Sequence, residues 1–246
     1  MQIIPVIDLM QGHVVHAKRG IRSQYQAIQS SLCKGSAPFT VIDAILKLYP
    51  FQTLYIADLD AILGSGNHAD LTLKISQKYP NLNIWLDCGI RQINARALYQ
   101  GNNSQLNIRP VVGSENIANL QDYRAISYAC ESQHILSLDY SATSAMGIAE
   151  LHNSARFWPD HTICMTLNAV GNTQGVDMAK LNDLIQLNRA RKNPSQLYAA
   201  GGVRHLADIQ ALEKMGIAGV LVATALHSGA LSQADIESIH TIKSPS

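Results

Sequence analysis

Two six-residue stretches decide the fold: LDCGIR at Leu86–Arg91 and AAGGVR at Ala199–Arg204. Each one ends a short apolar run, and each is followed by a helical pattern and then by another β-branched run. Their glycines, Gly89 and Gly202, lie 113 residues apart in a chain of 246 residues, which is close to half its length. A half-chain repeat of strand, glycine turn and helix predicts a structure built from two similar halves.

Short β-branched runs recur eight times, with amphipathic segments between them. This alternation predicts βα units and a parallel sheet. Eight units of about 31 residues fit a single (βα)8 TIM barrel, which averages about 250 residues, although a doubly wound open sheet gives the same alternation. The expected strands are Ile3–Asp8, Thr53–Ala57, Asn83–Leu86, Arg109–Val112, His134–Asp139, Thr162–Thr166, Gln196–Ala199 and Gly219–Val222.

Helical patterns fill the gaps between these runs, and the weakest lies in the fifth crossover, residues 141–160. No Pro/Ser linker or shift in composition divides the chain, so we expect one domain. The duplicated half-barrels would span about 1–130 and 131–240, with a short tail at 241–246. The expected helices are Phe39–Leu48, Ala69–Tyr79, Ile93–Tyr99, Ile117–Ala129, Met178–Arg189, Leu206–Met215 and Gln233–Ile239.

The composition excludes several classes of protein. With 47% hydrophobic and 15% charged residues, the chain is a soluble globular type rather than a disordered one. Its 19 basic and 18 acidic residues include no basic cluster, so neither nucleic acid nor an anionic membrane is an expected partner. The N-terminal residues lack the basic flank and cleavage site expected of a signal peptide, and no window approaches 18 uninterrupted apolar residues. We expect a cytoplasmic monomer that binds a phosphorylated small molecule.

Two aspartates, Asp8 and Asp139, end the first and fifth expected strands. In an eight-stranded barrel these strands lie opposite each other, and their carboxyl ends face the site. Two carboxylates across a substrate can act as general acid and general base if their environments separate their pKa values. The alternative is that either aspartate caps a following loop through backbone N–H groups.

The glycine turn after the seventh strand predicts a phosphate site. Gly201 and Gly202 let the backbone approach an anion, and the following Val203 leads into a helix with free N–H groups. Ala223 and Thr224, after the eighth strand, would complete this site, because barrels commonly bind phosphate at these two loops. A tight turn that needs glycine for its backbone conformation, with no ligand, is the alternative.

The matching turn of the first half, with Gly89 and then Gly113 and Ser114, is the candidate for a second phosphate site. Here Asp87 stands where the second half has a small residue, and a carboxylate beside a phosphate dianion is repulsive unless it is protonated or points away. Asp87 could instead accept from a hydroxyl or an amine of a different substrate. We therefore expect one good phosphate site, in the second half.

The chain resembles the HisA/HisF family of histidine biosynthesis over nearly its whole length. The resemblance rests on IPVIDLMQGHVVHAKRG around Asp8, LYIADLDA at 54–61, LSLDY around Asp139, AAGGVR at 199–204 and GVLVATAL at 219–226. It implies a duplicated barrel and an Amadori rearrangement of a ribosylamine phosphate. Asp8 would be the base, Asp139 the acid that opens the furanose, and Thr166 a further catalytic residue. It implies no metal and no organic cofactor.

Three features depart from the family pattern. Residues 87–91 read DCGIR where the family has a glycine-rich GGGIR, and residues 166–175 keep the threonine but lack the aspartate of the usual loop. The tryptophan-bearing loop after the fifth strand is not recognisable. These departures resemble a divergent branch found beside methanopterin-type one-carbon metabolism. That branch implies a monophosphorylated substrate, and a non-catalytic barrel that binds a phosphorylated ligand is a further alternative.

Other polar residues are weaker candidates. Lys18 and Arg19 lie in a polar loop that could bring positive charge to a phosphate or simply be solvated. Asp58, at the end of the second strand, could contact the substrate. His13 and His16 are too few for a metal site, so no metal is expected.

Overall fold

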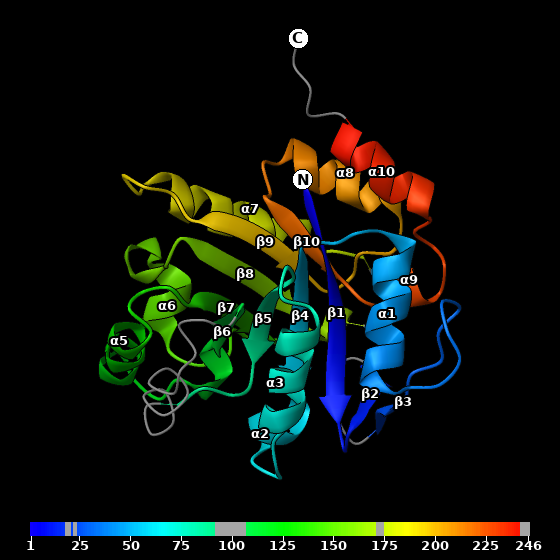
Figure 1. The fold of residues 1–246 in the computed structure, drawn as a ribbon. Coiled ribbons are helices and arrows are strands. Elements are labelled where there is room, and N and C mark those ends of the chain that lie inside the picture. Colours follow the sequence, from blue (N-terminus) through cyan, green and yellow to red (C-terminus); the bar gives the residue numbers. More distant parts are fainter. Residues whose placement is uncertain (18–20, 22–23, 92–106, 171–174, 242–246) are drawn as a thin grey trace.

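The computed structural model describes residues 1–17, 21, 24–91, 107–170 and 175–241 (Figure 1). Eight parallel strands form a closed barrel in chain order, and the last strand pairs with the first through Gln2–Gly219 to Pro5–Val222. The barrel strands are β1 (Gln2–Met10), β4 (Thr53–Asp58), β5 (Asn83–Asp87), β6 (Ile108–Gly113), β7 (Ile135–Tyr140), β8 (His161–Thr166), β9 (Gln196–Ala200) and β10 (Gly219–Val222).

This closure confirms the predicted (βα)8 barrel and excludes the open doubly wound sheet, because an open sheet has two unpaired edges. All eight expected strands are present, with ends that differ by a few residues. The duplication into half-barrels and its boundaries at about 130 and 240 stay predictions drawn from the sequence repeat.

Period-two alternation sorts the strand residues between two hydrophobic layers. One layer fills the barrel and includes Ile4, Trp85, Ile135 and Leu221. The other packs between the strands and the surrounding helices and includes the fully buried Ile7. Strand side chains that face inward near the carboxyl ends therefore reach the mouth of the barrel, where the candidate site lies.

Helices cover the outside of the barrel (Figure 1). Local signals explain where they begin: Pro38 stands in the first turn of α1, while Asn119 and Asp177 cap α5 and α7 by accepting from Asp122 and Lys180 N–H groups at 2.9 Å. The expected helix at 93–99 lies outside the described residues. The other six expected helices are present as α1 (Pro38–Leu48), α3 (Ala69–Lys78), α5 (Leu120–Ala129), α7 (Met178–Arg189), α8 (Leu206–Lys214) and α10 (Gln233–Thr241), and the weak pattern of the fifth crossover contains α6 (Ala149–Asn153).

Two short strands and two short α-helices were not predicted. Strands β2 (His13–His16) and β3 (Gln26–Ala27) form antiparallel pairs beside β1, and α2 (Leu59–Leu63) and α9 (Thr224–His227) are single turns after β4 and β10. All four follow the carboxyl end of a strand. In Figure 1 β2, β3 and α2 lie at the lower end of the view, where the β1 arrow ends, while the N-terminus and α10 lie at the opposite end.

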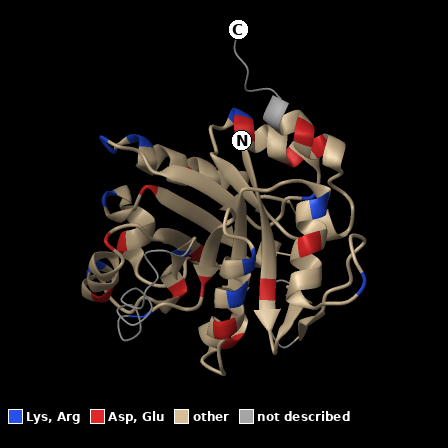
Figure 2. Cartoon of the chain, in the orientation of Figure 1, with Lys and Arg blue, Asp and Glu red and all other residues tan. Residues whose placement is uncertain are grey.

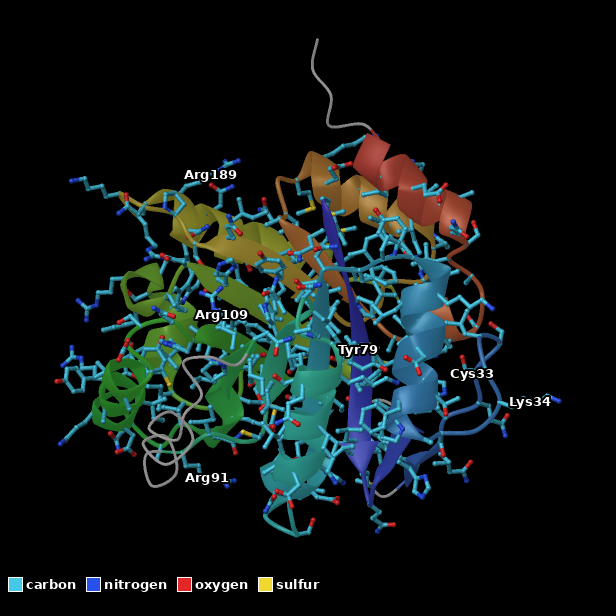
Figure 3. All side chains as sticks on the ribbon, viewed as in Figure 1. Cys33, Lys34, Tyr79, Arg91, Arg109 and Arg189 are labelled. Carbon is cyan, nitrogen blue, oxygen red and sulfur yellow. The ribbon has the colours of Figure 1, made fainter. Side chains whose placement is uncertain are left out.

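The opposite end of the barrel is closed by polar side chains. Arg109, which lies among the strands in Figure 3, donates to the Gln133 carbonyl at 2.7 Å. The Tyr198 hydroxyl lies 3.0 Å from His161 Nδ1, and the Tyr198 ring packs edge-on against Trp85. These contacts fill the base of the barrel, so the interior is accessible from the carboxyl end.

Charged residues are dispersed over the helices and loops rather than gathered in one patch of a single sign (Figure 2). None of the helices in the described ranges is long and apolar enough to cross a membrane.

Candidate active site

A cavity of about 470 Å³ opens at the carboxyl ends of the barrel strands. It is lined by residues of most of the strands and by the loops that follow them, which is where (βα)8 barrels place their sites. Among the described residues that line it, only Arg204 is basic, while four are acidic. The acidic residues are Asp8, Asp87, Glu115 and Asp139.

Asp8 and Asp139 both line this cavity, as expected from the sequence. Asp8 lies near the carboxyl end of β1, where its neighbours in register are Ala57 of β4 and Val15 of β2. It lies two residues after the inward-facing Val6, on the same face of the strand, and is half-buried. The barrel order places β7, the strand of Asp139, four positions from β1 around the ring, so the two carboxylates approach the cavity from opposite sides.

Asp139 is 5% exposed, and hydrogen-bond donors hold its carboxylate in place. Ser137 Oγ donates to Oδ1 at 2.7 Å, and Oδ2 accepts from Ser114 Oγ at 3.3 Å and from the Glu115 N–H at 3.2 Å. Burial raises the pKa of Asp139 to about 7, with Asp87 and Glu115 adding to the rise, while the Ser137 and Glu115 donors act against it. Near neutral pH this carboxyl group can therefore give or take a proton.

Asp87 is a third carboxyl group at the site and is 9% exposed. Its Oδ2 accepts from the Tyr55 hydroxyl at 3.1 Å, and its Oδ1 accepts from the Gly89 N–H at 3.1 Å. Burial, followed by the charges of Asp87, Asp139 and Asp8, raises the pKa of Tyr55 well above its usual value. Tyr55 therefore stays protonated, and its hydroxyl donates a hydrogen bond to Asp87.

The sequence reasoning missed Tyr55 and Glu115. Tyr55 could have been found from strand alternation, because it lies two residues before Ala57 on the inward face of β4. Glu115 carried no such signal, since it follows β6 in the short helix η3 (Ser114–Asn116).

Gly113 and Ser114 lie between the acidic groups rather than on the cavity wall. A Cβ at Gly113 would lie 3.2 Å from Asp139 Oδ2 and 3.8 Å from Asp87 Oδ2. Ser114 is fully buried, and its Oγ also accepts from the Asp139 N–H at 2.9 Å. These two residues, which the sequence suggested as phosphate ligands, lie where they position Asp139.

Gly89 also lies away from the cavity. Its φ is +63°, and a Cβ there would meet Ile62 Cα of α2 at 2.8 Å, so close packing explains the glycine. Its N–H, which the sequence suggested for phosphate, donates to Asp87. In the first half of the chain, the turn after β5 thus places the Asp87 carboxylate near the cavity, whereas the matching turn after β9 places main-chain groups there.

The turn after β9 has the geometry of a close backbone approach. Gly201 and Gly202 have φ of +93° and +82°, and Cβ atoms there would meet the Thr166 and Gly175 carbonyl oxygens at 2.4 and 2.2 Å. Only glycine fits both positions. The five residues expected at this phosphate site all line the cavity: Gly201, Gly202, Val203, Ala223 and Thr224.

Arg204 lines the same end of the cavity, but its charge is partly offset. The Arg204 guanidinium lies 3.0 Å from Asp208 Oδ1, and the main-chain N–H of Arg204 donates to Asp208 Oδ2 at 2.9 Å. Burial raises the pKa of Asp208, and the stronger combined effect of Arg204 and His205 lowers it below its usual value. An anion at this end would therefore meet main-chain groups beside a guanidinium that already has a partner.

The remaining candidates lie elsewhere. Asp58 is buried and caps α2: it accepts from the Ala61 N–H at 3.1 Å, and its Oδ1 lies 2.8 Å from His68 Nδ1, so its contacts are structural. Thr166 is buried on the outward face of β8 and does not line the cavity. Lys18 and Arg19 lie outside the described residues. Within the described part of the chain, no group of three or more His, Cys, Asp or Glu side chains could hold a metal ion.

The fold and the site define a class: (βα)8 barrels with acidic side chains at the strand ends and a glycine turn beyond β9. The sequence matches the family described as "Histidine biosynthesis protein" over residues 2–232. The chain belongs to this family, which confirms the resemblance to HisA and HisF.

Two relatives illustrate the range of the family. An uncharacterised protein of Methanocaldococcus jannaschii is 29% identical over 245 residues, covering 97% of each chain. A 1-(5-phosphoribosyl)-5-((5-phosphoribosylamino)methylideneamino)imidazole-4-carboxamide isomerase of Campylobacter hominis is 28% identical over 242 residues, covering 94% of this chain and 96% of its own.

A solved structure supports the fold alone. It is 3-hexulose-6-phosphate synthase of Salmonella typhimurium, with a TM-score of 0.61 and 12% identity, covering 99% of this chain and 100% of that chain. The family relationship supports an isomerase-type protein that binds phosphorylated small molecules.

Proposed function

We propose that the protein catalyses an Amadori-type aldose–ketose isomerisation of an N-substituted 5-phosphoribosylamine. The observation that carries this proposal is the pair Asp8 and Asp139, which line one cavity from opposite strands and differ in environment. Asp139 is deeply buried with a pKa near 7, whereas Asp8 is half-buried at the mouth. Such a pair can divide the roles of acid and base.

The reaction needs four proton transfers, of which Asp139 and Asp8 make the first two. Asp139 donates a proton to the furanose ring oxygen, the bond from that oxygen to C1 breaks, and the amine lone pair forms an imine with C1. Asp8 then removes the proton from C2, giving an enolamine. Protonation of C1 and loss of the C2 hydroxyl proton leave the ketose, so the product is an isomer and no oxidant is consumed.

The substrate phosphate would bind at the turn formed by Gly201, Gly202 and Val203 together with Ala223 and Thr224. Two facts support this placement: these residues line the same cavity as the aspartates, and the glycine pair allows the backbone to come close to an anion. Arg204 adds positive charge at the same end.

A second candidate is a related reaction on a substrate with a single phosphate. It is favoured by Asp87, whose buried carboxyl group with its Tyr55 partner stands where a second phosphate would need donors. The name of the Campylobacter hominis relative carries two phosphoribosyl groups, which together make a larger anion than a compound with one phosphate. A role in the biosynthesis of a one-carbon carrier of the methanopterin type stays a prediction from the sequence departures.

The test is an isomerase assay with two substrates. One is the bis-phosphoribosyl imidazole carboxamide of the relatives, and the other is an N-aryl 5-phosphoribosylamine with one phosphate; product is followed by absorbance and mass spectrometry. We expect turnover of the monophosphate in preference to the bisphosphate, and a loss of at least about 100-fold in kcat for Asp8→Asn and for Asp139→Asn.

The controls separate the alternatives. Asp160→Asn, at an exposed position just before the amino end of β8 and outside the cavity lining, should leave kcat unchanged. Turnover of the bisphosphate alone would show that Asp87 tolerates a second phosphate. If folded protein binds phosphate but converts neither substrate, the isomerase proposal fails and a non-catalytic phosphate-binding barrel is favoured.

A further inference from the structure

A second, much smaller cavity of about 20 Å³ adjoins the candidate site. It lies between β1, β2 and α9, and its size admits a single oxygen-sized group. Asp8 and Thr224 line both cavities, so the two are neighbours rather than separate sites. The small cavity differs from the large one in being lined by two histidines, His16 and His227.

His227 is 5% exposed, and its ring orientation is fixed from one side. Ser30 Oγ lies 2.9 Å from Nδ1 and already accepts from the Leu32 N–H at 3.1 Å, so the Ser30 hydroxyl proton is available to Nδ1. We therefore assign the proton of the neutral ring to Nε2. The Ser31 N–H, which donates to the His227 carbonyl at 2.7 Å, anchors the same loop to α9.

His227 Nε2 is buried and has no hydrogen-bond partner among the described residues. Buried donors are nearly always paired, so an unpaired one beside a cavity requires an explanation. The group that would satisfy it must be an acceptor small enough to reach the cavity. A phosphate oxygen held at Thr224 meets both conditions.

His16 lines the same small cavity from β2. Its Nε2 lies 3.3 Å from Thr224 Oγ1, although the two residues are 208 positions apart in the chain. Thr224 is one of the residues expected to hold phosphate. The β2 hairpin, which lies outside the repeated βα units, thus brings an imidazole to the anion end of the site.

We propose that His16 and His227 complete the phosphate site, donating from β2 and α9 to the oxygens of a phosphate monoester dianion. This rests on the phosphate placement in the proposed function and deepens it. The two imidazoles supply donors that the main chain and the partnered Arg204 do not.

The histidines play different roles because their environments differ. Burial, followed by the charge of His16, lowers the pKa of His227 to about 4, so His227 acts as a neutral N–H donor at pH 7. His16 is half-buried, and a bound dianion favours its imidazolium form. Among the described residues, the polar and titratable groups that line this cavity beside it are Asp8 from β1, and Thr224 and His227 from α9. Anion binding should therefore take up a proton at His16.

The experiment is calorimetric titration with sulfate, a phosphate analogue that stays doubly charged, between about pH 6 and pH 8.5. Wild-type protein should bind sulfate about tenfold more tightly at the acidic end. His16→Gln should lose most of this pH dependence, and His227→Gln should weaken binding about three- to tenfold at both pH values. His13→Gln is the matched control, because His13 lies on the same strand, is exposed and lies 3.1 Å from Ser36 Oγ.

A second measurement covers the case in which His227→Gln does not fold. In wild-type protein labelled with nitrogen-15, sulfate should shift the His227 Nε2–H resonance, and an unchanged resonance at saturating sulfate would overturn the proposal.

The outcomes separate this proposal from the proposed function. Equal sulfate affinity in all variants would show that the histidines do not bind the anion, while the placement of the phosphate at the glycine turn would stand. Histidine-dependent sulfate binding without isomerase turnover would support the histidine proposal and contradict the proposed reaction. No sulfate binding by wild type would overturn both the histidine proposal and the phosphate placement.

Discussion

At the scale of single residues, Asp139 links the chemistry of the site to the stability of the fold. Its folded-state pKa of about 7 lies above the ordinary value of 3.8. Between these two values the native carboxyl group holds a proton that the unfolded chain releases, so stability falls as pH rises from about 4 to about 7. Above that range the carboxylate is ionised in both states and the full cost is present.

Asp139→Asn should therefore stabilise the protein at alkaline pH while removing activity. The amide has no charge to desolvate; its oxygen can accept from the Glu115 N–H, and its NH₂ can donate to Ser137 Oγ. The gain in unfolding free energy at pH 8 should approach an upper limit of about 4 kcal/mol and should be small at pH 4. Urea unfolding at both pH values measures it, and an equal effect at the two values would contradict the assigned burial cost.

At the scale of elements, the glycine turn after β9 offers a comparison within one chain. Gly202 and Gly216 have φ of +82° and +84°, but a Cβ at Gly202 would meet the Gly175 oxygen at 2.2 Å, whereas Gly216 has nothing within 4 Å. Gly216→Ala should cost about 1–2 kcal/mol from the left-handed backbone alone. Gly202→Ala should cost at least about 1 kcal/mol more and should weaken sulfate binding, because the turn must move.

Thermal unfolding of both variants, with sulfate titration of each, measures this difference. Equal losses of stability in the two variants would mean that the Gly175 carbonyl can move away from the added methyl group with no loss of unfolding free energy. Unchanged sulfate binding by Gly202→Ala would remove this turn from the anion site.

The elements that could be predicted from the sequence are those long enough to repeat their hydrophobic pattern several times. Eight buried strands and helices such as Met178–Arg189 carry enough alternation or amphipathicity to be located. The β2–β3 hairpin and the single-turn helices α2 and α9 are too short to show a period. The same limit applied to the site: Asp8 and Asp139 follow from strand ends, but the N-cap role of Asp58 depends on the unpredicted α2.

At the scale of the whole molecule, the acidic end of the cavity joins the two halves of the chain. Asp87 belongs to the first half and Asp139 to the second, yet the charge of Asp87 raises the pKa of Asp139. A Cβ at Gly113, on the strand between them, would lie within 4 Å of both carboxylates. The near-neutral composition of the chain did not reveal this concentration of like charge, because it arises only when the barrel closes.

Asp87→Asn should therefore lower the pKa of Asp139 by on the order of one unit, since it removes a like charge while its amide oxygen can still accept from the Gly89 N–H. Carbon-13 NMR of the Asp139 carboxyl group measures the pKa directly, and the alkaline limb of the isomerase pH profile should move in the same direction, because the acid must be protonated to act. Asp43→Asn is the control, because Asp43 is exposed on α1 and bonds Lys78. An Asp139 pKa that does not change in Asp87→Asn would mean that burial alone sets it, and that the two halves contribute independent groups to the site.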